Sequence, residues 1–450
     1  MCHEKKVTIA VYKALKSRLL SDSFKDEYRT EEQHFTRKRT FTFLIVMISI
    51  LNNISKSLGV ELTKFLMKFG RGDVGSKQAF SQARHKIKWE AFTDLNDTLI
   101  SAYYSQGTHR LYKDKYLLLA TDGSDYELPW EADLVTEFGA ADNKITKQPI
   151  CMAKGVKIWD ALNKMTVKSY LGHYDVAEIQ HFKKVWEQTT DFLATIPQVW
   201  DTRWLLLADM HYPSFWLFHA LMDTQRDFLF RCPPSFCRET IAFMATNEQE
   251  AVLKIGINTD QYRRSVFKRQ TGLKKAPEYI LVRALKYARP NGEISCLVTS
   301  IPSKELDFQS IVELYPYRWT EEVSYNFDKN SAEIENFSSK TPLGIRQEWY
   351  ANTLSTNMAQ LLIEDAQELL DEEQKDKDNK HDYQINRSIA FGILKDEIPK
   401  MLFGNESPKA FRKRMLPLIL RHRVPIRPNR SYPRKKKHKL KFSMNFRRCL

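Results

Sequence analysis

The sequence has few of the features that mark secreted, zinc-stabilised or membrane-spanning proteins. Its six cysteines are scattered over 450 residues, which excludes a disulfide framework and suggests a reducing compartment. Only Cys232 and Cys237 lie close together, and no second Cys or His pair stands at zinc-finger spacing. The longest apolar run, Phe41 to Leu51, is too short to span a bilayer and lies too far along the chain for a signal peptide. We therefore expect it to form a buried helix, and we expect no membrane partner.

Acidic residues are absent beyond Glu406, whereas sixteen lysines and arginines follow it. These cations account for the formal net charge of +15, so residues 1–406 are close to neutral. The tail is either a solvated, solubilising segment or an electrostatic contact to nucleic acid, and counterion release favours the second. The predicted contacts are the four consecutive cations Arg434, Lys435, Lys436 and Lys437.

The rest of the composition, 42% hydrophobic and 28% charged, describes a globular protein with two to four domains. Residues 1–106 contain few helix breakers and predict helices over 37–54, 76–87 and 89–104, the second capped by Ser76. The second helix and its flank are basic, which indicates either a solvated face or a DNA contact. The cations are Lys77, Arg84, Lys86 and Lys88.

An α/β unit follows the helical segment. The apolar runs 116–121 and 204–208 predict buried strands, each ending just before an aspartate, Asp122 and Asp209. Between them the pattern predicts a hairpin over 150–159 and 164–171 and a helix over 177–194. A helix over 215–222 and a strand over 227–231 come next, and residues 232–310 are rich in predicted strands, with a turn signal at Asn291-Gly292.

The stretch from Tyr315 to Lys329 gathers aromatic, basic and acidic side chains at helical spacing. On a helix, Tyr315, Arg318, Glu322 and Lys329 fall within an arc of roughly 60°, whereas Glu321 points about 100° away from Glu322. A carboxylate among cations stays ionised, and the cations can hold phosphate oxygens. The plain alternative is a surface helix with an i, i+4 Arg–Glu pair.

The pattern Tyr-x2-Arg-x3-Glu-x6-Lys resembles the signature of the DDE transposases of bacterial insertion sequences, specifically the insertion-sequence-four family. The resemblance implies a ribonuclease-H-like α/β catalytic domain over 107–345, with a β-rich insertion over about 232–310. It also implies a helical N-terminal domain over 1–106 that binds the DNA ends. We place a helical C-terminal region over 346–426 and a basic tail over 427–450.

In such a fold the first and fourth strands are neighbours, so Asp122, Asp209 and Glu322 are the expected catalytic and metal-binding acids. Three carboxylates suffice to hold two Mg²⁺ ions, for which Mn²⁺ substitutes, because the ions keep water and substrate oxygens as further ligands. The resemblance implies that Tyr315, Arg318 and Lys329 contact DNA phosphates. Glu321 and Asp125 are the competing acids, and Asp125 is a candidate for a supporting role.

The resemblance implies cut-and-paste transposition through a hairpin intermediate, on double-stranded DNA that carries terminal inverted repeats and on target DNA. It further implies a homodimer and a cytoplasmic location near the bacterial nucleoid. Two departures weaken the hairpin expectation. His211 stands near the place where many relatives have an arginine after the second acid. The insertion also lacks a tryptophan to wedge a flipped base, and Phe230, Phe236 and Tyr262 are only candidates for that role. The alternatives are a metal-dependent nuclease without strand transfer and an inactive, transposase-derived DNA-binding protein.

Overall fold

The structure is a computed structural model. It describes residues 6–37, 39–52, 58–68, 75–142, 148–256, 277–289, 292–375, 377 and 380–427. The basic tail from residue 428 onward, with Arg434 to Lys437, lies outside the described residues, as do Tyr262 and Asn291. Within them, no helix is long and apolar enough to cross a membrane.

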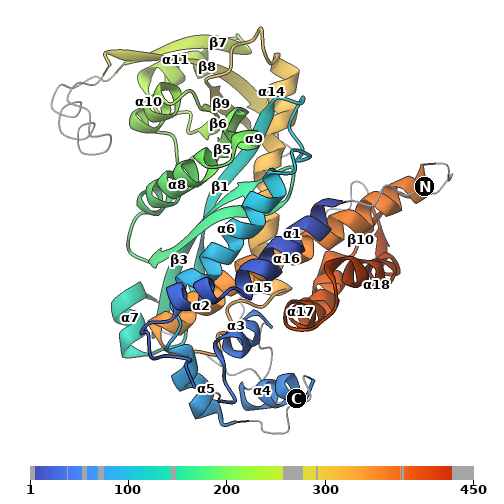
Figure 1. Ribbon diagram of the computed structural model, residues 1–450. Coiled ribbons are helices and arrows are strands. Elements are labelled where there is room, and N and C mark those ends of the chain that lie inside the picture. The colour runs from blue at the N-terminus through green and yellow to red at the C-terminus, as the bar shows by residue number, and fades with distance from the viewer. Residues whose placement is uncertain are drawn as a thin grey trace.

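A nine-stranded sheet forms the centre of the upper part of the molecule (Figure 1). The strand order is β2-β3-β1-β5-β6-β9-β8-β7, with β4 paired to β3. Strands β1 and β5 are parallel neighbours, as are β5 and β6, whereas β3 runs antiparallel to β1. The bounds are β1 Tyr116–Glu127, β2 Ala140–Asp142, β3 Pro149–Asp160, β4 Met165–His173, β5 Arg203–Ala208, β6 Asp227–Cys232, β7 Glu250–Gly256, β8 Tyr279–Ala288 and β9 Ile294–Thr299.

The predicted strands and helices of the α/β unit are confirmed, with one correction. The first strand does not end before Asp122 but continues to Glu127, because residues 119–127 pair with β3 along their whole length. Helices cross between the strands and cover the sheet, and one of them, α11, lies in the stretch expected to be rich in strands. They are α7 Ala132–Phe138, α8 Glu178–Ala194, α9 Pro197–Trp200, α10 Phe215–Asp223 and α11 Arg238–Ala245.

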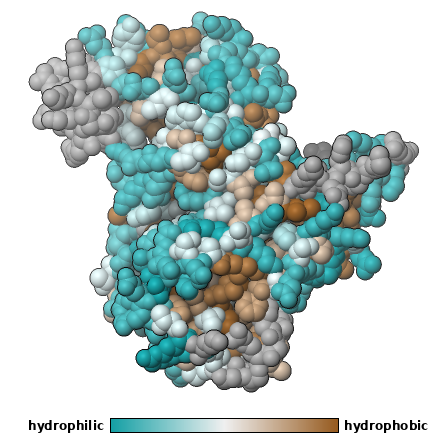
Figure 2. All heavy atoms as spheres, viewed as in Figure 1, coloured by the Kyte–Doolittle hydropathy of each residue, from teal (hydrophilic) through white to brown (hydrophobic). Residues whose placement is uncertain are grey.

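The hairpin of β7 and β8 forms the edge of the sheet opposite β2, and α10 and α11 contact it. Hydrophobic residues gather over this end, at the top of the view in Figure 2. The exposed ones include Val252, Tyr279, Leu281 and Ile294.

The signature stretch is split into two kinds of helix. After α14, Phe308–Leu314, the chain makes a 3₁₀ turn, η2 Tyr315–Arg318, and then α15, Trp319–Asn330. Pro316 lies in the 3₁₀ turn. The prediction of one continuous α-helix is therefore wrong at its first turn, where the tighter 3₁₀ winding changes the direction of each side chain.

The N-terminal and C-terminal helices form one body around α16, Pro342–Gln374, the long helix that crosses the molecule in Figure 1. The domain boundary predicted at 345 falls inside this helix. Helices α1, α3, α6, α17 and α18 all contact it. The remaining bounds are α1 Lys6–Leu19, α2 Asp22–Tyr28, α3 Phe43–Leu51, α4 Leu58–Lys68, α5 Lys77–Arg84, α6 Glu90–Tyr104, α17 Arg387–Phe403, α18 Pro408–Leu420, β10 Tyr383–Ile385 and β11 Arg423–Pro425.

Side chains join the two ends of the sequence within this body. The Tyr12 hydroxyl of α1 donates to the carbonyl of Met358 in α16, 2.7 Å away. The Lys16 ammonium donates to three carbonyls at the end of α17 and beyond it, at 2.6 to 3.1 Å. Those acceptors are Met401, Gly404 and Glu406. Because the last carbonyls of a helix have no partner within the helix, Lys16 satisfies groups that are otherwise left for water.

Candidate active site

The pairing of β1 with β5 brings the two predicted aspartates to one place. Each residue of β1 pairs with a β5 residue 87 positions later, from Tyr116 and Arg203 to Ala120 and Leu207. Asp122 and Asp209 are separated by the same 87 positions, so continuing the register sets them beside each other. Asp209 directly follows β5, and the backbone N–H of His211 donates to its Oδ1 at 2.8 Å.

The carboxylate of Asp122 is partly buried and surrounded by other acids. Burial raises its pKa to about 7, with the negative charges of Glu178 and Asp209 acting in the same direction. Arg318 and the backbone N–H of Gly123 oppose this rise. The site thus holds more negative charge than its own cations neutralise.

Arg318 links Asp122 to the predicted third acid. Its guanidinium is only 3% exposed and lies 3.6 Å from Oδ2 of Asp122 and 2.6 Å from Oε1 of Glu322. Glu322 itself is 54% exposed, on the open side of α15. Glu322 therefore lies on the same side of the sheet as Asp122, and Arg318 joins the two carboxylates.

Tyr315 and Lys329, the other two signature residues, contact groups other than Glu322. Tyr315 is 2% exposed and packs edge-on against Tyr287, and the cation of Arg318 opposes the rise in its pKa that burial causes. Lys329 donates to the carbonyl of Asp125 and lies 4.8 Å from the ring centre of Tyr126. The 3₁₀ turn explains the burial of Tyr315, since it breaks the helical arc on which the sequence pattern placed it.

Glu321, the competing acid, points into the protein. It is fully buried, and neither carboxylate oxygen has a hydrogen-bond partner of normal geometry. Burial raises its pKa well above the usual range, and Asp122 adds to the rise while Lys157 opposes it. Lys157, opposite Asp122 on β3, forms a buried ion pair with Asp328 of α15. The two glutamates therefore point apart, as the helical spacing predicted, and the structure shows Glu321 facing inward and Glu322 outward.

Sequence reasoning did not select Glu178, the first residue of α8. A side chain built on Gly123 would place its Cβ 2.2 Å from Oε2 of Glu178, so this carboxylate lies directly over the residue after Asp122. Burial raises the pKa of Glu178, and Asp209 adds to the rise. Its position at the start of the first helix after three strands was the only sequence signal, and a glutamate there is also a common helix N-terminal residue.

The donor chemistry of these residues suits a hard divalent cation, since all are carboxylates and Asp122 is crowded by uncompensated charge. Within the described residues, no three His, Cys, Asp or Glu side chains stand close enough together to enclose a metal ion. In this structure Glu322 is paired with Arg318 instead.

The aromatic residues that were candidates for wedging a flipped base differ in their burial. Phe230 is fully buried in β6 and stacks near Phe218 and Phe228, so it is not available to a DNA base. Phe236, on the loop before α11, is partly buried and packs against Phe218.

The cations of the predicted N-terminal basic cluster have different surroundings in the structure. Arg84 is buried and bonds to α16, at 2.9 Å from both Gln347 and Glu348. Lys86 instead lines a groove of about 610 Å³ beside α5, together with His34, Arg37 and Arg39. None of the described residues lining this groove is acidic, which makes it a candidate surface for a polyanion.

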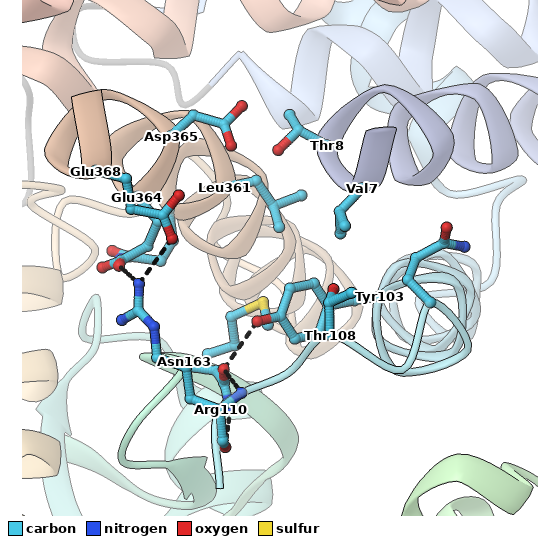
Figure 3. Close-up of a pocket in the computed structure, with 13 residues that line it drawn as sticks. Val7, Thr8, Tyr103, Thr108, Arg110, Asn163, Leu361, Glu364, Asp365 and Glu368 are labelled. Atoms are coloured by element: carbon cyan, nitrogen blue, oxygen red, sulfur yellow. Dashed lines mark hydrogen bonds and ion pairs between the residues drawn. The ribbon is translucent and has the colours of Figure 1, made fainter. Parts of the chain in front are cut away.

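A second cavity, of about 450 Å³, lies between α1, α6 and α16 (Figure 3). Arg110, on its lining, contacts Glu364 and Glu368, and Asn163 accepts a hydrogen bond from the Tyr103 hydroxyl. It contains none of the acids of the candidate site. We therefore do not connect it with phosphodiester chemistry.

No curated protein matches the chain. One similar solved structure is the cryo-EM synaptic complex of piggyBac transposase with hairpin DNA, with a TM-score of 0.46 and 9% identity over 97% of this chain and 90% of that one. Residues 139–358, which include Asp209 and Glu322 and begin after Asp122, match the family model described as the transposase DDE domain.

Proposed function

We propose that this chain is a DDE transposase that cuts DNA at the ends of a mobile element and joins the freed ends to target DNA. The match to the transposase DDE domain supports the class of enzyme. The observation that carries the proposal is the shared register of Asp122 and Asp209, with Arg318 joining Asp122 to Glu322.

The proposed metal ligands are Asp122, Asp209 and Glu322, for two Mg²⁺ ions or Mn²⁺. When bound, such ions supply charge neutralisation at the scissile phosphate and activation of the attacking oxygen. For Glu322 to serve as a ligand, its carboxylate must exchange Arg318 for the cation. Because Glu322 is half exposed, its side chain has room to turn away from Arg318.

The chain's own cations have roles in binding DNA in this proposal. Arg318, released from Glu322, presents a planar donor group to a phosphate beside the cleavage site. Lys329 offers a point charge at the other end of the same helix. Tyr315 contacts a phosphate only if its buried hydroxyl becomes accessible when DNA binds. The groove with Arg37 and Arg39 and the basic tail add sequence-independent attraction.

The reaction begins with attack of water on the phosphodiester at the element's end, which frees a 3′-hydroxyl. In the hairpin route, that hydroxyl attacks the opposite strand, and a second water opens the hairpin before the 3′ ends join target DNA. We further propose that strands β4-β3-β1-β5-β6, with α8 and α10 between them, form a ribonuclease-H-like core. A homodimer that brings two ends together, in the cytoplasm at the nucleoid, completes the proposal.

The experiment uses the full chain, DNA carrying the sequences that flank its gene, a supercoiled target plasmid and Mg²⁺. We expect cleaved ends and joined products with the unaltered protein, and neither with Glu322→Gln. DNA binding in a gel-shift assay is expected to survive the substitution. Glu313→Gln, on an exposed position of α14, is the matched control and should retain full activity. Unchanged cutting by Glu322→Gln would remove the site assignment.

The same assay separates the two other functions. Cleavage without any joined product favours a metal-dependent nuclease. Binding without cleavage by the unaltered protein favours an inactive, transposase-derived DNA-binding protein.

A further inference from the structure

Helix α15 carries Glu322 on its exposed side and Tyr325 on its buried side. Tyr325 is 5% exposed, and its hydroxyl donates to the backbone carbonyl of Asp122 in β1, 2.7 Å away. The carbonyl of Gly155 in β3 lies 3.5 Å from the same hydroxyl. A carbonyl oxygen has two lone pairs, so Asp122 can accept this bond and remain paired with β3. The helix that carries one proposed acid is therefore bonded directly to the strand residue that carries another.

The aromatic ring of Tyr325 has contacts of its own. The ammonium of Lys157 lies 4.8 Å from the ring centre, which is within the range of a cation–π contact. The ring of Tyr126 lies 6.5 Å away, at an angle of 62°. These contacts restrict the ring, so that its hydroxyl is held toward the Asp122 carbonyl.

A second contact attaches α15 to the same place in the sheet. Lys157 forms a buried ion pair with Asp328, three residues after Tyr325. Lys157 is also the β3 residue directly opposite Asp122. Because residues three apart lie on one side of a helix, Tyr325 and Asp328 attach one face of α15 to a single cross-strand pair. Two neighbouring attachments fix both the position and the rotation of the helix, and with them the place of Glu322.

We propose that Tyr325 is a positioning residue for DNA cleavage, which holds Glu322 in register with Asp122 through its bond to the Asp122 carbonyl. This inference rests on the proposed function, because it takes the reaction and the two acids from it. Tyr325 itself does not touch the DNA. Displacing reacting groups by about 1 Å can reduce a rate by about a hundredfold, so this bond matters more to the rate than to the fold.

The test compares two tyrosines that make the same bond in different places. Tyr325→Phe removes the hydroxyl beside Asp122. Tyr12→Phe removes a hydroxyl that donates to the carbonyl of Met358, also at 2.7 Å, in the body of helices around α16. Both tyrosines are buried, so both variants should lose a similar amount of stability in urea unfolding. Only Tyr325→Phe should slow DNA cleavage.

The cleavage rate is measured in single turnovers, with the full chain in excess over DNA that carries the sequences flanking its gene, and with Mg²⁺. We expect Tyr325→Phe to lower the rate at saturation by about tenfold or more, with unchanged DNA affinity in fluorescence anisotropy. Tyr12→Phe should cut at the unaltered rate. Tyr325→4-aminophenylalanine restores a neutral N–H donor at the same point of the ring, so it should recover most of the rate.

Several results would overturn the inference. Cleavage by Tyr325→Phe at the unaltered rate, or an equal slowing by both Phe variants, would leave the bond a matter of stability alone. Weaker DNA binding with an unchanged rate at saturation would make Tyr325 a DNA contact instead. Failure of the aromatic amine to recover the rate would show that the hydrogen bond is not what positions Glu322.

These results leave the proposed function standing, because the unaltered protein still cuts DNA and Glu322→Gln does not. If the unaltered protein makes no cut, or if Glu322→Gln cuts normally, the proposed function fails and this inference fails with it.

Discussion

The guanidinium of Arg318 lies 3.6 Å from the carboxylate of Asp122, from which nearly two hundred residues separate it in the chain. It is the closest positive charge to Asp122 among the ion pairs of the described residues. Arg318 neutralises the charge of Asp122 only in part. The nearby carboxylates of Glu178 and Asp209 act in the opposite direction and raise the pKa of Asp122. The charge balance of the site is therefore set by packing between β1, α8 and α15.

The raised pKa of Asp122 predicts how the metal-free protein responds to pH. Between the ordinary pKa near 3.8 and about 7, the folded state holds a proton that the unfolded state has lost. The contribution of Asp122 to stability therefore falls as pH rises through this window, by at most about 4 kcal/mol. Asp122→Asn removes the titration, so the variant should gain stability relative to the unaltered protein as pH rises.

Urea unfolding in the presence of a chelator, at pH values from 4.5 to 8, measures this difference. Glu187→Gln, at an exposed position of α8, serves as the control for a carboxylate replaced outside the site. A constant difference for Asp122→Asn would show that the Asp122 carboxylate is not disfavoured in the fold.

Breaking the buried pair of Lys157 and Asp328 should strongly destabilise the fold, because it leaves one buried charge without its partner. Both side chains are 2% exposed, so Lys157→Met leaves the Asp328 charge buried without a partner. We expect a loss of about 3–5 kcal/mol in the free energy of unfolding. The double variant with Asp328→Leu should recover most of the loss, since it removes both charges.

Lys154→Met is the control for this prediction. Lys154 lies on the same strand, but its partner Asp125 is 3.9 Å away and half exposed, so the expected loss is below about 1 kcal/mol. Equal losses at Lys154 and Lys157 in urea unfolding would contradict the assignment of a buried pair.

The groove beside α5 predicts that Arg37 and Arg39 contribute to DNA binding and that Arg84 contributes to stability instead. The pair Arg37→Glu and Arg39→Glu should weaken DNA binding and reduce the slope of log affinity against log salt concentration by about two. Arg84→Met, in contrast, should lower stability by about 3 kcal/mol with little change in DNA affinity, because Arg84 is bonded to α16. Fluorescence anisotropy over a salt series measures both. If Arg84→Met flattens the salt dependence and the Arg37, Arg39 variant does not, the groove is not the contact surface.

The tail prediction concerns residues beyond those described. A chain ending after Arg427 should bind nonspecific DNA more weakly and with a flatter dependence on salt. The cut is placed there because Arg423–Pro425 form β11, which pairs with β10 and belongs to the folded body. Unchanged affinity and slope in the same anisotropy assay would make the tail a solubilising appendage.

Much of the sheet could be predicted because its strands are continuous apolar runs. The run 204–208 ends at Asp209 both in the sequence pattern and in the structure. The run 116–121 gave the start of β1 but not its end, because residues 122–127 are polar and remain in the strand through pairing with β3. Pairing is a tertiary contact and leaves no mark on local hydrophobicity.

The candidate site could likewise be predicted only where local geometry determines it. Helical spacing predicted that Glu321 and Glu322 point apart, which depends only on local geometry. It could not predict the burial of Tyr315, because the 3₁₀ turn changes the rotation per residue. Nor could it select Glu178 or Arg84, whose roles depend on Gly123 and on α16, residues distant in sequence.

The bonds from Lys16 to the carbonyls of Met401, Gly404 and Glu406 bear on how the protein can be prepared in shortened form. A recombinant fragment limited to 107–345 loses both partners of this link and cuts α16 near its start, which uncovers the apolar faces that α1, α6 and α17 bury. The smallest piece suited to purification and crystallisation therefore runs from about residue 6 to 427, with affinity tags attached outside that span.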